Sequence, residues 1–277
     1  MKKISIVIVC LITVLCSLQN CSQDLNLEKN ADHSLTIYCG ITMVKPIREL
    51  IDIFEKENKC AMTIIPGSSE DLYQSLKLSR KGDLYLPGSD TYRSLHSAEG
   101  LMADYIHVGY NRVAMIVAKG NPKRISADIY NLAKKEYAVA IGNPEVCSIG
   151  QVTKKILTKA GIYDKVVDNA VRITADSRGS AKLLREGSVD LILNWQATAY
   201  FDENREFMET LVLDESMTPK KQLLINLLTC TKNAGLARRF MIFAGSVAGQ
   251  NIFQKYGFRD TIGKPEKVKN KGNNHND

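Results

Sequence analysis

Residues 34–86 read SLTIYCGITMVKPIRELIDIFEKENKCAMTIIPGSSEDLYQSLKLSRKGDLYL. Three short apolar runs in this stretch, at residues 35–39, 61–65 and 84–86, predict β-strands. Between them, apolar residues recur three or four positions apart and predict helices over residues 45–57 and 70–78. The βαβαβ order predicts a layered α/β structure with largely parallel strands.

A second α/β series follows the first. Its strands are expected at residues 112–118, 137–141, 171–174 and 189–194, and its helices at residues 149–160 and 180–185. After a loop at residues 202–205, two more strands (210–213 and 223–229) and two helices (234–244 and 248–256) complete the pattern. Two α/β series followed by such late strands and helices form two lobes more easily than one continuous sheet. We expect lobe one to hold residues 34–115 and 226–262, and lobe two residues 116–225.

The composition is that of an ordinary folded protein. Of the 277 residues, 44% are hydrophobic and 24% are charged, which excludes disordered and collagen-like chains. The formal net charge is +7, but basic and acidic residues alternate along the helical segments, and this distribution disfavours a nucleic-acid-binding protein. Beyond the extreme N-terminus, no run of eighteen apolar residues predicts a membrane span.

The first 20 residues predict an export signal. Two lysines precede an apolar run over residues 4–18, and Cys21 follows shortly after. This order is similar to a bacterial lipoprotein signal, in which the cysteine becomes the lipidated first residue of the mature chain. Cys16 is a weaker alternative, and an ordinary cleaved signal is another. We expect a protein anchored by lipid in the periplasm or at the cell surface, with a tether at residues 21–33 and a disordered tail at residues 263–277.

Four cysteines follow the predicted signal and anchor: Cys39, Cys60, Cys147 and Cys230. They are widely spaced and form no C-x-x-C pair, so a structural zinc is not expected. An oxidising compartment allows a disulfide, whose pairing the spacing leaves open, and buried free thiols are favoured over it.

Several predicted helices begin at turns with small hydroxyl residues. Thr42 follows the first strand, Ser69 follows the second, and Ser148 and Ser177 stand at the starts of two later helices. In α/β units these turns lie at the carboxyl ends of strands, where the unpaired N–H groups of a helix start can bind an anion. Each residue taken singly is also an ordinary helix N-cap. Their recurrence in corresponding places predicts a ligand cleft.

No catalytic constellation accompanies these turns. His96 and His107 have no Ser or Cys partner in a recognisable nucleophile motif, and Asp83 and Asp90 are typical of turns and caps. Phosphate-loop, dinucleotide-binding and H-E-x-x-H motifs are absent. We expect a binding protein rather than an enzyme, with no cofactor and no protein-coordinated metal.

The stretch AVAIGNPE at residues 138–145, followed by Gly150, is the most specific of several motifs. The others are GSSEDL at 67–72, the segment at 187–195 and KYGFR at 255–259. In these motifs, residues from about 35 to 259 resemble the molybdate-binding proteins of bacterial ABC importers. The resemblance implies the two-lobed type II periplasmic binding protein fold, with a mixed sheet flanked by helices in each lobe.

The resemblance assigns ligand binding to Thr42, Ser69, Ile149, Ser177 and Trp195. Arg178, beside Ser177, is predicted as a further ligand-binding residue. Ser69 stands at a ligand serine, Thr42 replaces another serine, and Trp195 replaces a tyrosine but offers an indole N–H. Ile149 and Ser177 lie where the family uses backbone N–H groups. Arg178 departs from the family pattern, and in the cleft it would favour a more strongly charged or bidentate oxyanion.

The implied function is a receptor that captures molybdate or tungstate and delivers it to a membrane permease and its ATPase. Sulfate, phosphate and ferric iron, which are ligands of other proteins with this fold, remain alternatives. Iron would need tyrosine or carboxylate ligands, for which Tyr110 and Tyr200 are candidates. A sensory or structural lipoprotein without transport would share the same features.

Overall fold

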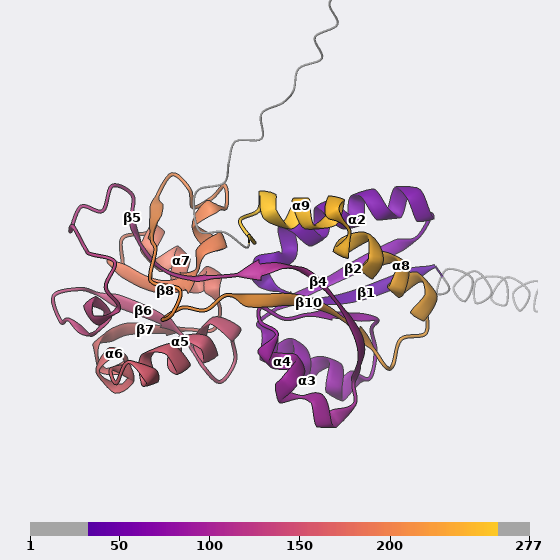
Figure 1. Cartoon of the computed structure of the whole chain (residues 1–277), viewed down its shortest axis with the longest axis horizontal. Helices are drawn as coiled ribbons and strands as arrows, with labels where there is room; N and C mark the ends of the chain where they lie inside the picture. The colour runs from indigo at the N-terminus through magenta and orange to yellow at the C-terminus, as the bar shows by residue number, and fades with distance from the viewer. Residues whose placement is uncertain (1–32, 260–277) are drawn as a thin grey trace, which may run out of the picture.

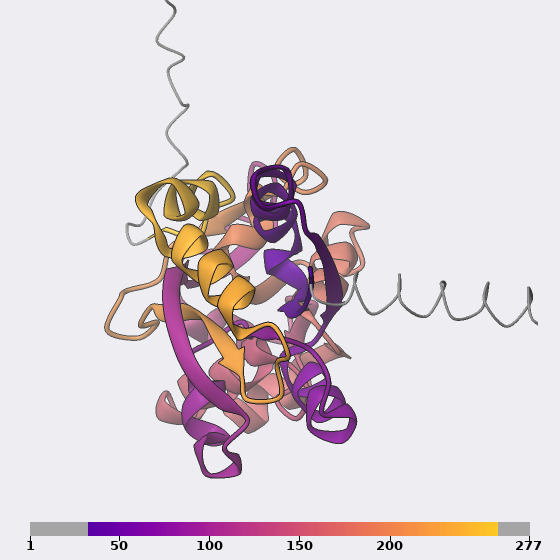
Figure 2. The ribbon, with the colours of Figure 1, turned by 90° about the vertical axis from the view of Figure 1, so that its right-hand side faces the viewer.

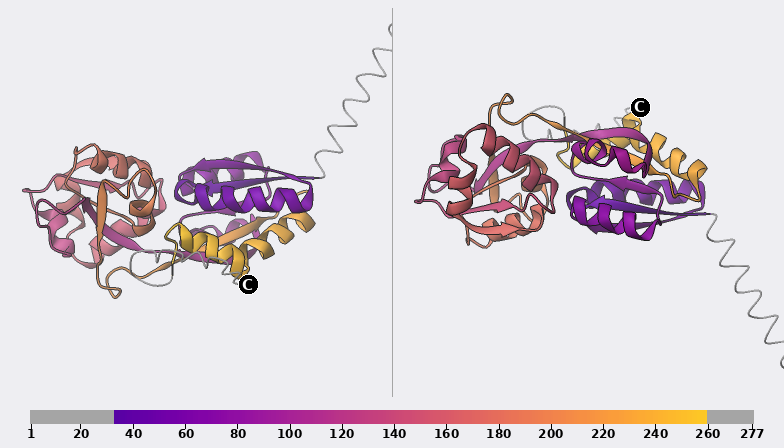
Figure 3. Two further views of the ribbon diagram at one scale, coloured as in Figure 1. Left: turned by 90° about the horizontal axis from the view of Figure 1, so that it is seen from above. Right: turned by 90° about the horizontal axis from the view of Figure 1, so that it is seen from below.

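The computed structural model describes residues 33–259 and places them in two lobes, each built on a five-stranded sheet. The lobes lie side by side along the long axis of the molecule, and the views from above and below separate them clearly (Figures 1 and 3). The predicted signal, Cys21, nearly all of the tether and the predicted tail lie outside the described residues.

The sheet of lobe one has the strand order β2-β1-β3-β10-β4. Its strands are β1 (Ser34–Gly40), β2 (Ala61–Gly67), β3 (Leu84–Leu86), β4 (Met102–Asn111) and β10 (Lys221–Leu228). Strands β2, β1 and β3 are parallel, and β10 runs antiparallel to both β3 and β4. The late strand therefore returns to the sheet that the first part of the chain began.

The sheet of lobe two has the strand order β7-β6-β8-β5-β9. Its strands are β5 (Val113–Ala118), β6 (Val139–Gly142), β7 (Ala170–Thr174), β8 (Leu191–Trp195) and β9 (Met208–Leu211). Strands β7, β6 and β8 are parallel, whereas β5 runs antiparallel to β8 and β9. The predicted α/β class, with a mixed sheet in each lobe, is confirmed.

Helices cover both faces of each sheet (Figures 1 and 2). The α-helices are α2 (Val44–Asn58), α3 (Ser69–Ser79), α4 (Thr91–Leu95), α5 (Ser148–Lys159), α6 (Tyr163–Asn169), α7 (Ser177–Arg185), α8 (Ala234–Gly245) and α9 (Val247–Lys255). Short 3₁₀ helices are η1 (Ile41–Met43), η2 (Ser97–Glu99), η3 (Ile129–Ala133) and η4 (Gln196–Tyr200). In lobe one, α2, α8 and α9 pack on one face and α3 and α4 on the other.

Apolar spacing explains why these segments are helical. In α2, Ile47, Leu50, Ile51 and Phe54 are buried on one face, and their spacing of three and four residues is that of an amphipathic helix. Their burial against β1 and α8 stabilises lobe one, at about 1.5–3 kcal/mol for each fully buried side chain. The helix ends at Lys59, whose φ of 50° is left-handed and cannot continue the helix.

The chain crosses between the sheets twice. It passes from β4 to β5 at Arg112, and it returns between Leu211 and Lys221. Met115 and Leu224, near which the crossings are expected, lie within β5 and β10, shortly after these points. The lobe limits themselves stay a prediction.

The sequence patterns do not predict three of the observed elements: β4, α4 and α6. The first half of β4 exposes Ala103, Asp104 and Tyr105, so it has no alternation of buried and exposed side chains. Its strand conformation comes from pairing with β10, which is a long-range contact. Helices α4 and α6 have five and seven residues, too few to show a clear helical period.

Candidate functional site

The carboxyl ends of the parallel strands of both sheets face one another and enclose a small cavity. Its empty volume is about 240 Å³, including the opening to solvent. Ligands of open α/β sheets bind at this edge, where strands end and helices begin. The cavity is lined by Gly40, Ile41, Thr42, Gly67, Ser68, Ser69, Gly88, Cys147, Ser148, Asp176, Ser177 and Trp195.

Three helices direct their N-termini at this cavity. Helix α3 begins at Ser69, α5 at Ser148 and α7 at Ser177, and each of these first residues lines the cavity. The first N–H groups of a helix have no intrahelical partner and carry a partial positive charge. Three such termini make the cavity suited to an anion, without a cation among its lining residues.

Ser69 is held in position by two buried hydrogen bonds. Its Oγ accepts from the backbone N–H of Gly88 at 3.1 Å, and its carbonyl oxygen accepts from the Tyr85 hydroxyl at 2.8 Å. Burial raises the pKa of Tyr85 well above its ordinary value, so the phenol stays protonated and remains a donor. Since one lone pair of Ser69 Oγ is engaged, its own proton is available for a ligand in the cavity.

Thr42, Ser177 and Trp195 complete the set of predicted residues that line the cavity, and all three are buried. The hydroxyl of Thr42 has only the weak acceptor Met43 Sδ at 3.0 Å. The carbonyl of Ser177 accepts from Asn194 Nδ2 at 2.8 Å, which ties the start of α7 to strand β8. The structure thus brings together Thr42 and Ser69 from lobe one with Ser177 and Trp195 from lobe two.

Ile149 and Arg178 are not among the lining residues of the cavity. The Ile149 side chain is buried in the core of lobe two, and only its place as the second residue of α5 keeps its backbone near the cavity. Arg178 is exposed. Burial opposes ionisation of Glu203, but the hydrogen bond and charge of Lys45, with a smaller contribution from Arg178, lower the pKa of that carboxyl.

Asp176 is a lining residue that the sequence patterns did not single out. Its Oδ1 accepts from the backbone N–H of Gly179 at 2.8 Å and caps helix α7. It is the only ionisable carboxylate among the lining residues named above. The signal was present in the sequence as an Asp directly before Ser177, an N-cap position.

The two lobes touch beside the cavity. The backbone N–H of Glu70, at the start of α3, donates to the carbonyl of Val146 at 3.2 Å. Cys147, next to Val146, is buried, and desolvation raises the pKa of its thiol to about 11. Like Cys39, Cys60 and Cys230, it is a free cysteine.

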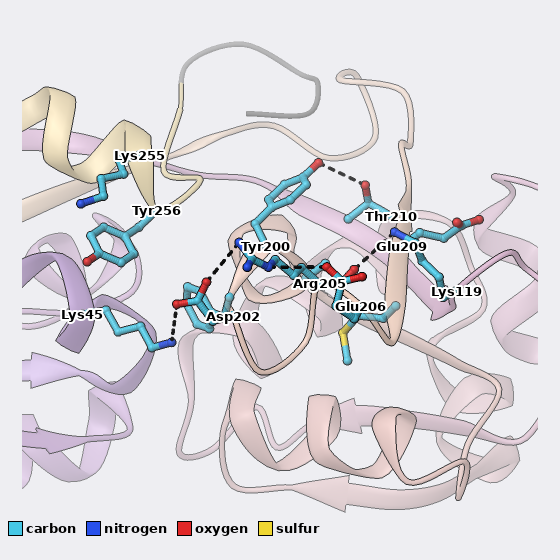
Figure 4. A pocket seen from close by; sticks show the side chains of 13 residues that line it. Lys45, Lys119, Tyr200, Asp202, Arg205, Glu206, Glu209, Thr210, Lys255 and Tyr256 are labelled. Carbon is cyan, nitrogen blue, oxygen red and sulfur yellow. Dashed lines mark hydrogen bonds and ion pairs between the residues drawn. The ribbon is translucent and has the colours of Figure 1, made fainter. Parts of the chain in front are cut away.

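A second, larger hollow, with an empty volume of about 2000 Å³ including the opening to solvent, lies between the lobes on the side of α2, η4 and α9 (Figure 4). Some of its charged side chains pair with one another, as in the contacts of Lys45 and Arg205 with Asp202. Tyr200 lines this hollow, with its hydroxyl 3.4 Å from Thr210 Oγ1.

The other tyrosine weighed for iron, Tyr110, packs on His107 and under Lys220. Neither Tyr110 nor Tyr200 is among the residues that line the smaller cavity. Within residues 33–259, no group of three or more His, Cys, Asp or Glu side chains could hold a metal ion.

Residues 35–259 match the family described as bacterial extracellular solute-binding proteins. The chain belongs to this family. A Bacillus subtilis relative of this solute-binding protein, "Putative ABC transporter substrate-binding lipoprotein YvgL", is 24% identical over 93% of this chain and 98% of its own. The molybdate-binding protein ModA of Haemophilus influenzae is 21% identical over 82% of this chain and 91% of its own.

Solved structures share the fold of this solute-binding protein. The periplasmic molybdate-binding protein of Azotobacter vinelandii has a TM-score of 0.70 at 14% identity, covering 83% of this chain and 100% of its own. The sulfate-binding protein SubI of Mycobacterium tuberculosis has a TM-score of 0.71 at 18% identity (82% and 86% covered). A periplasmic thiamin-binding protein has a TM-score of 0.73 at 16% identity (84% and 85% covered). The predicted two-lobed periplasmic binding protein fold is confirmed.

The family consists of solute-binding proteins rather than enzymes. Among residues 33–259, no helix is both long enough and apolar enough to cross a membrane. The structural relatives are described as binding ligands as different as molybdate, sulfate and thiamin, so the shared fold does not identify the ligand.

Proposed function

We propose that this protein is an extracytoplasmic receptor that captures a tetrahedral oxyanion between its lobes and delivers it to an ABC importer. The convergence of three helix N-termini on a cavity lined with hydroxyl groups and an indole carries the proposal. Such donors hold an anion without a counter-charge, and closure of the lobes removes water and strengthens each hydrogen bond. A permease and its ATPase are the partners that this role requires.

Molybdate or tungstate is the ligand that we propose first. Thr42, Ser69, Ser177, the indole of Trp195 and the backbone at Ile149 supply donors, and a fully deprotonated oxyanion offers only acceptors. The relatives described as molybdate-binding support this choice. Sulfate has the same charge as molybdate and tungstate, so the protein can discriminate between them only by the width of its cavity.

Asp176 favours a second candidate, a protonated oxyanion such as hydrogen phosphate. A carboxylate beside the ligand accepts the proton of such an ion, whereas it repels one that carries no proton. The two candidates predict opposite effects of Asp176→Asn, which keeps a capping side chain for Gly179. Molybdate binding should be unchanged or stronger in this variant, and phosphate binding should be weaker.

Calorimetric titration with molybdate, tungstate, sulfate, phosphate and a ferric complex tests the proposal. Tighter binding of molybdate or tungstate than of the other ions supports the first candidate, and tighter binding of phosphate supports the second. Binding of the ferric complex alone, or of none of these ligands, would refute an oxyanion receptor. A sensory lipoprotein would bind the ion but would not restore its uptake in cells that lack only the binding protein and keep the permease and its ATPase.

We also propose that the protein is lipid-anchored through Cys21, which follows the predicted signal. Cys21→Ser should release a soluble product, whereas Cys16→Ser should leave the anchor in place. Mass spectrometry of the mature chain checks both variants. A chain that begins elsewhere and carries no lipid would contradict the anchor without affecting the binding site.

A further inference from the structure

Gly88 lies at a close contact between lobe one and lobe two beside the cavity. It follows strand β3, lines the cavity and is buried. A Cβ built on Gly88 would overlap the hydroxyl of Ser148, the first residue of α5 in lobe two. The same Cβ would lie 3.2 Å from Ser148 Cβ and 3.6 Å from the indole nitrogen of Trp195. Its three nearest neighbours therefore all belong to the opposite lobe.

The backbone of Gly88 has little freedom to move away from this contact. Its N–H donates to Ser69 Oγ at 3.1 Å, and its carbonyl accepts from Asn111 Nδ2 at 2.8 Å. Ser69, Gly88 and Asn111 are all buried, and all three belong to lobe one. Both polar groups of the Gly88 residue are thus fixed to lobe one, and moving them would leave buried groups unpaired.

We propose that Gly88 determines how closely the two lobes approach, and through that distance which oxyanion the cavity fits. The proposal rests on the proposed function, because it concerns the same cavity. With no side chain at position 88, the donors of lobe two, among them Ser177 and Trp195, come within reach of a ligand held by Ser69 and Thr42. A methyl group at position 88 would separate the two sets of donors.

A rotation of the Ser148 hydroxyl does not remove the conflict. It would still leave the new Cβ 3.2 Å from Ser148 Cβ, a separation that is tighter than nine in ten contacts of real Cβ atoms. Because interiors are closely packed, the lobes must separate by a few tenths of an ångström or more. Hydrogen bonds weaken steeply when they are stretched or misaligned, so a small separation affects every donor of lobe two.

The test compares Gly88→Ala with the wild type, and the double variant Gly88→Ala/Ser148→Gly with Ser148→Gly alone, because Ser148 itself lines the cavity. Gly235→Ala is the matched control, because a Cβ at this exposed position of helix α8 meets nothing within 4 Å. Gly88 and Gly235 both lie outside the left-handed region of φ, so alanine adds no backbone strain at either position. Titrations with molybdate and with phosphate measure affinity, small-angle scattering measures contraction, and thermal melting without ligand checks the fold.

Gly88→Ala should weaken binding at least about tenfold, the effect of losing one hydrogen bond to a charged group. It should also reduce the contraction on ligand addition, while the melting temperature without ligand stays that of the wild type. In the Ser148→Gly background, which lacks Ser148 Oγ and Cβ, Gly88→Ala should leave most of the affinity of Ser148→Gly intact. The Gly235→Ala control should bind like the wild type.

Two results would overturn the inference alone: Gly88→Ala binding as tightly as Gly235→Ala, or Gly88→Ala weakening binding as much in the Ser148→Gly background as in the wild type. The second result would show that the effect does not come from the contact with Ser148. If the wild type binds neither molybdate, phosphate nor the other oxyanions, the proposed function fails and the inference fails with it. The two failures are therefore distinguishable by the titration of the wild type.

Discussion

Removal of the Ser69 hydroxyl is the perturbation that tests the site most directly. Ser69 is 3% exposed, stands at the start of helix α3 and lines the cavity. Its Oγ already accepts a hydrogen bond from Gly88, so its remaining role is to donate toward the ligand. Ser69→Ala removes both interactions and leaves the Tyr85 bond to the Ser69 carbonyl in place.

The expected magnitude follows from these two lost bonds. A hydrogen bond to a charged ligand contributes about 1.5–3 kcal/mol, so the affinity should fall about tenfold to a hundredfold. The buried N–H of Gly88 is left without its acceptor, which costs about 1–3 kcal/mol of folding free energy. For a protein of this size, each kcal/mol lowers the melting temperature by about 2–4 °C.

Calorimetric titration and thermal melting measure the two effects separately. Ser75→Ala is the matched control, because Ser75 lies on the same helix, is exposed, and donates only to the carbonyl of Asp71 at 2.8 Å. The control should retain full affinity. If Ser69→Ala melts at a lower temperature but binds every oxyanion as the wild type does, Ser69 stabilises the loop without binding the ligand, and the assigned site is refuted.

Three further predictions concern Thr42, Arg178 and Glu49. Thr42→Val should also weaken oxyanion binding about tenfold to a hundredfold, and an unchanged titration would remove Thr42 from the site. Arg178→Ala should leave the affinity within about twofold of the wild type, since the side chain is exposed and outside the cavity lining; a larger loss in calorimetry would place it in the cleft. Although burial works in the opposite direction, hydrogen bonds from Lys255 and Tyr256 lower the pKa of Glu49. A lowered carboxyl pKa stabilises the fold above the ordinary Glu value of about 4.3, and this contribution is lost as the pH falls through the lowered folded value. Glu49→Gln should therefore cost at most about 1 kcal/mol near pH 7 and nothing in strong acid, as acid and neutral denaturant titrations can compare.

The regular part of the fold could be predicted because its signals are local. The buried stripe of α2, with Ile47, Leu50 and Phe54, repeats at the helical period, and β3 begins and ends where its apolar run does. Strand β4 could not be predicted in this way. It contains Asp104, His107 and Gly109, and it is a strand because β10, more than a hundred residues away, pairs with it.

The part of the candidate site that lies at helix N-termini could be predicted from the sequence. Ser69, Ser148 and Ser177 each begin a helix after a predicted strand, and a hydroxyl in that place is visible in the sequence. The same reasoning does not predict correctly whether the Arg178 side chain lines the cavity. Arg178 neighbours Ser177 in the sequence, but successive residues of a helix point in directions about 100° apart, and its side chain is exposed.

The sequence by itself therefore determined the α/β class, the positions of most strands and helices, and the small polar residues where helices begin. These features depend on periodicity and turn chemistry within some fifteen residues. Only the tertiary structure decided which of these turns share a cavity, that Asp176 is among them, and that Gly88 meets Ser148 across the lobes. Such contacts join residues from different sheets, so they depend on how the two crossings of the chain set one lobe against the other.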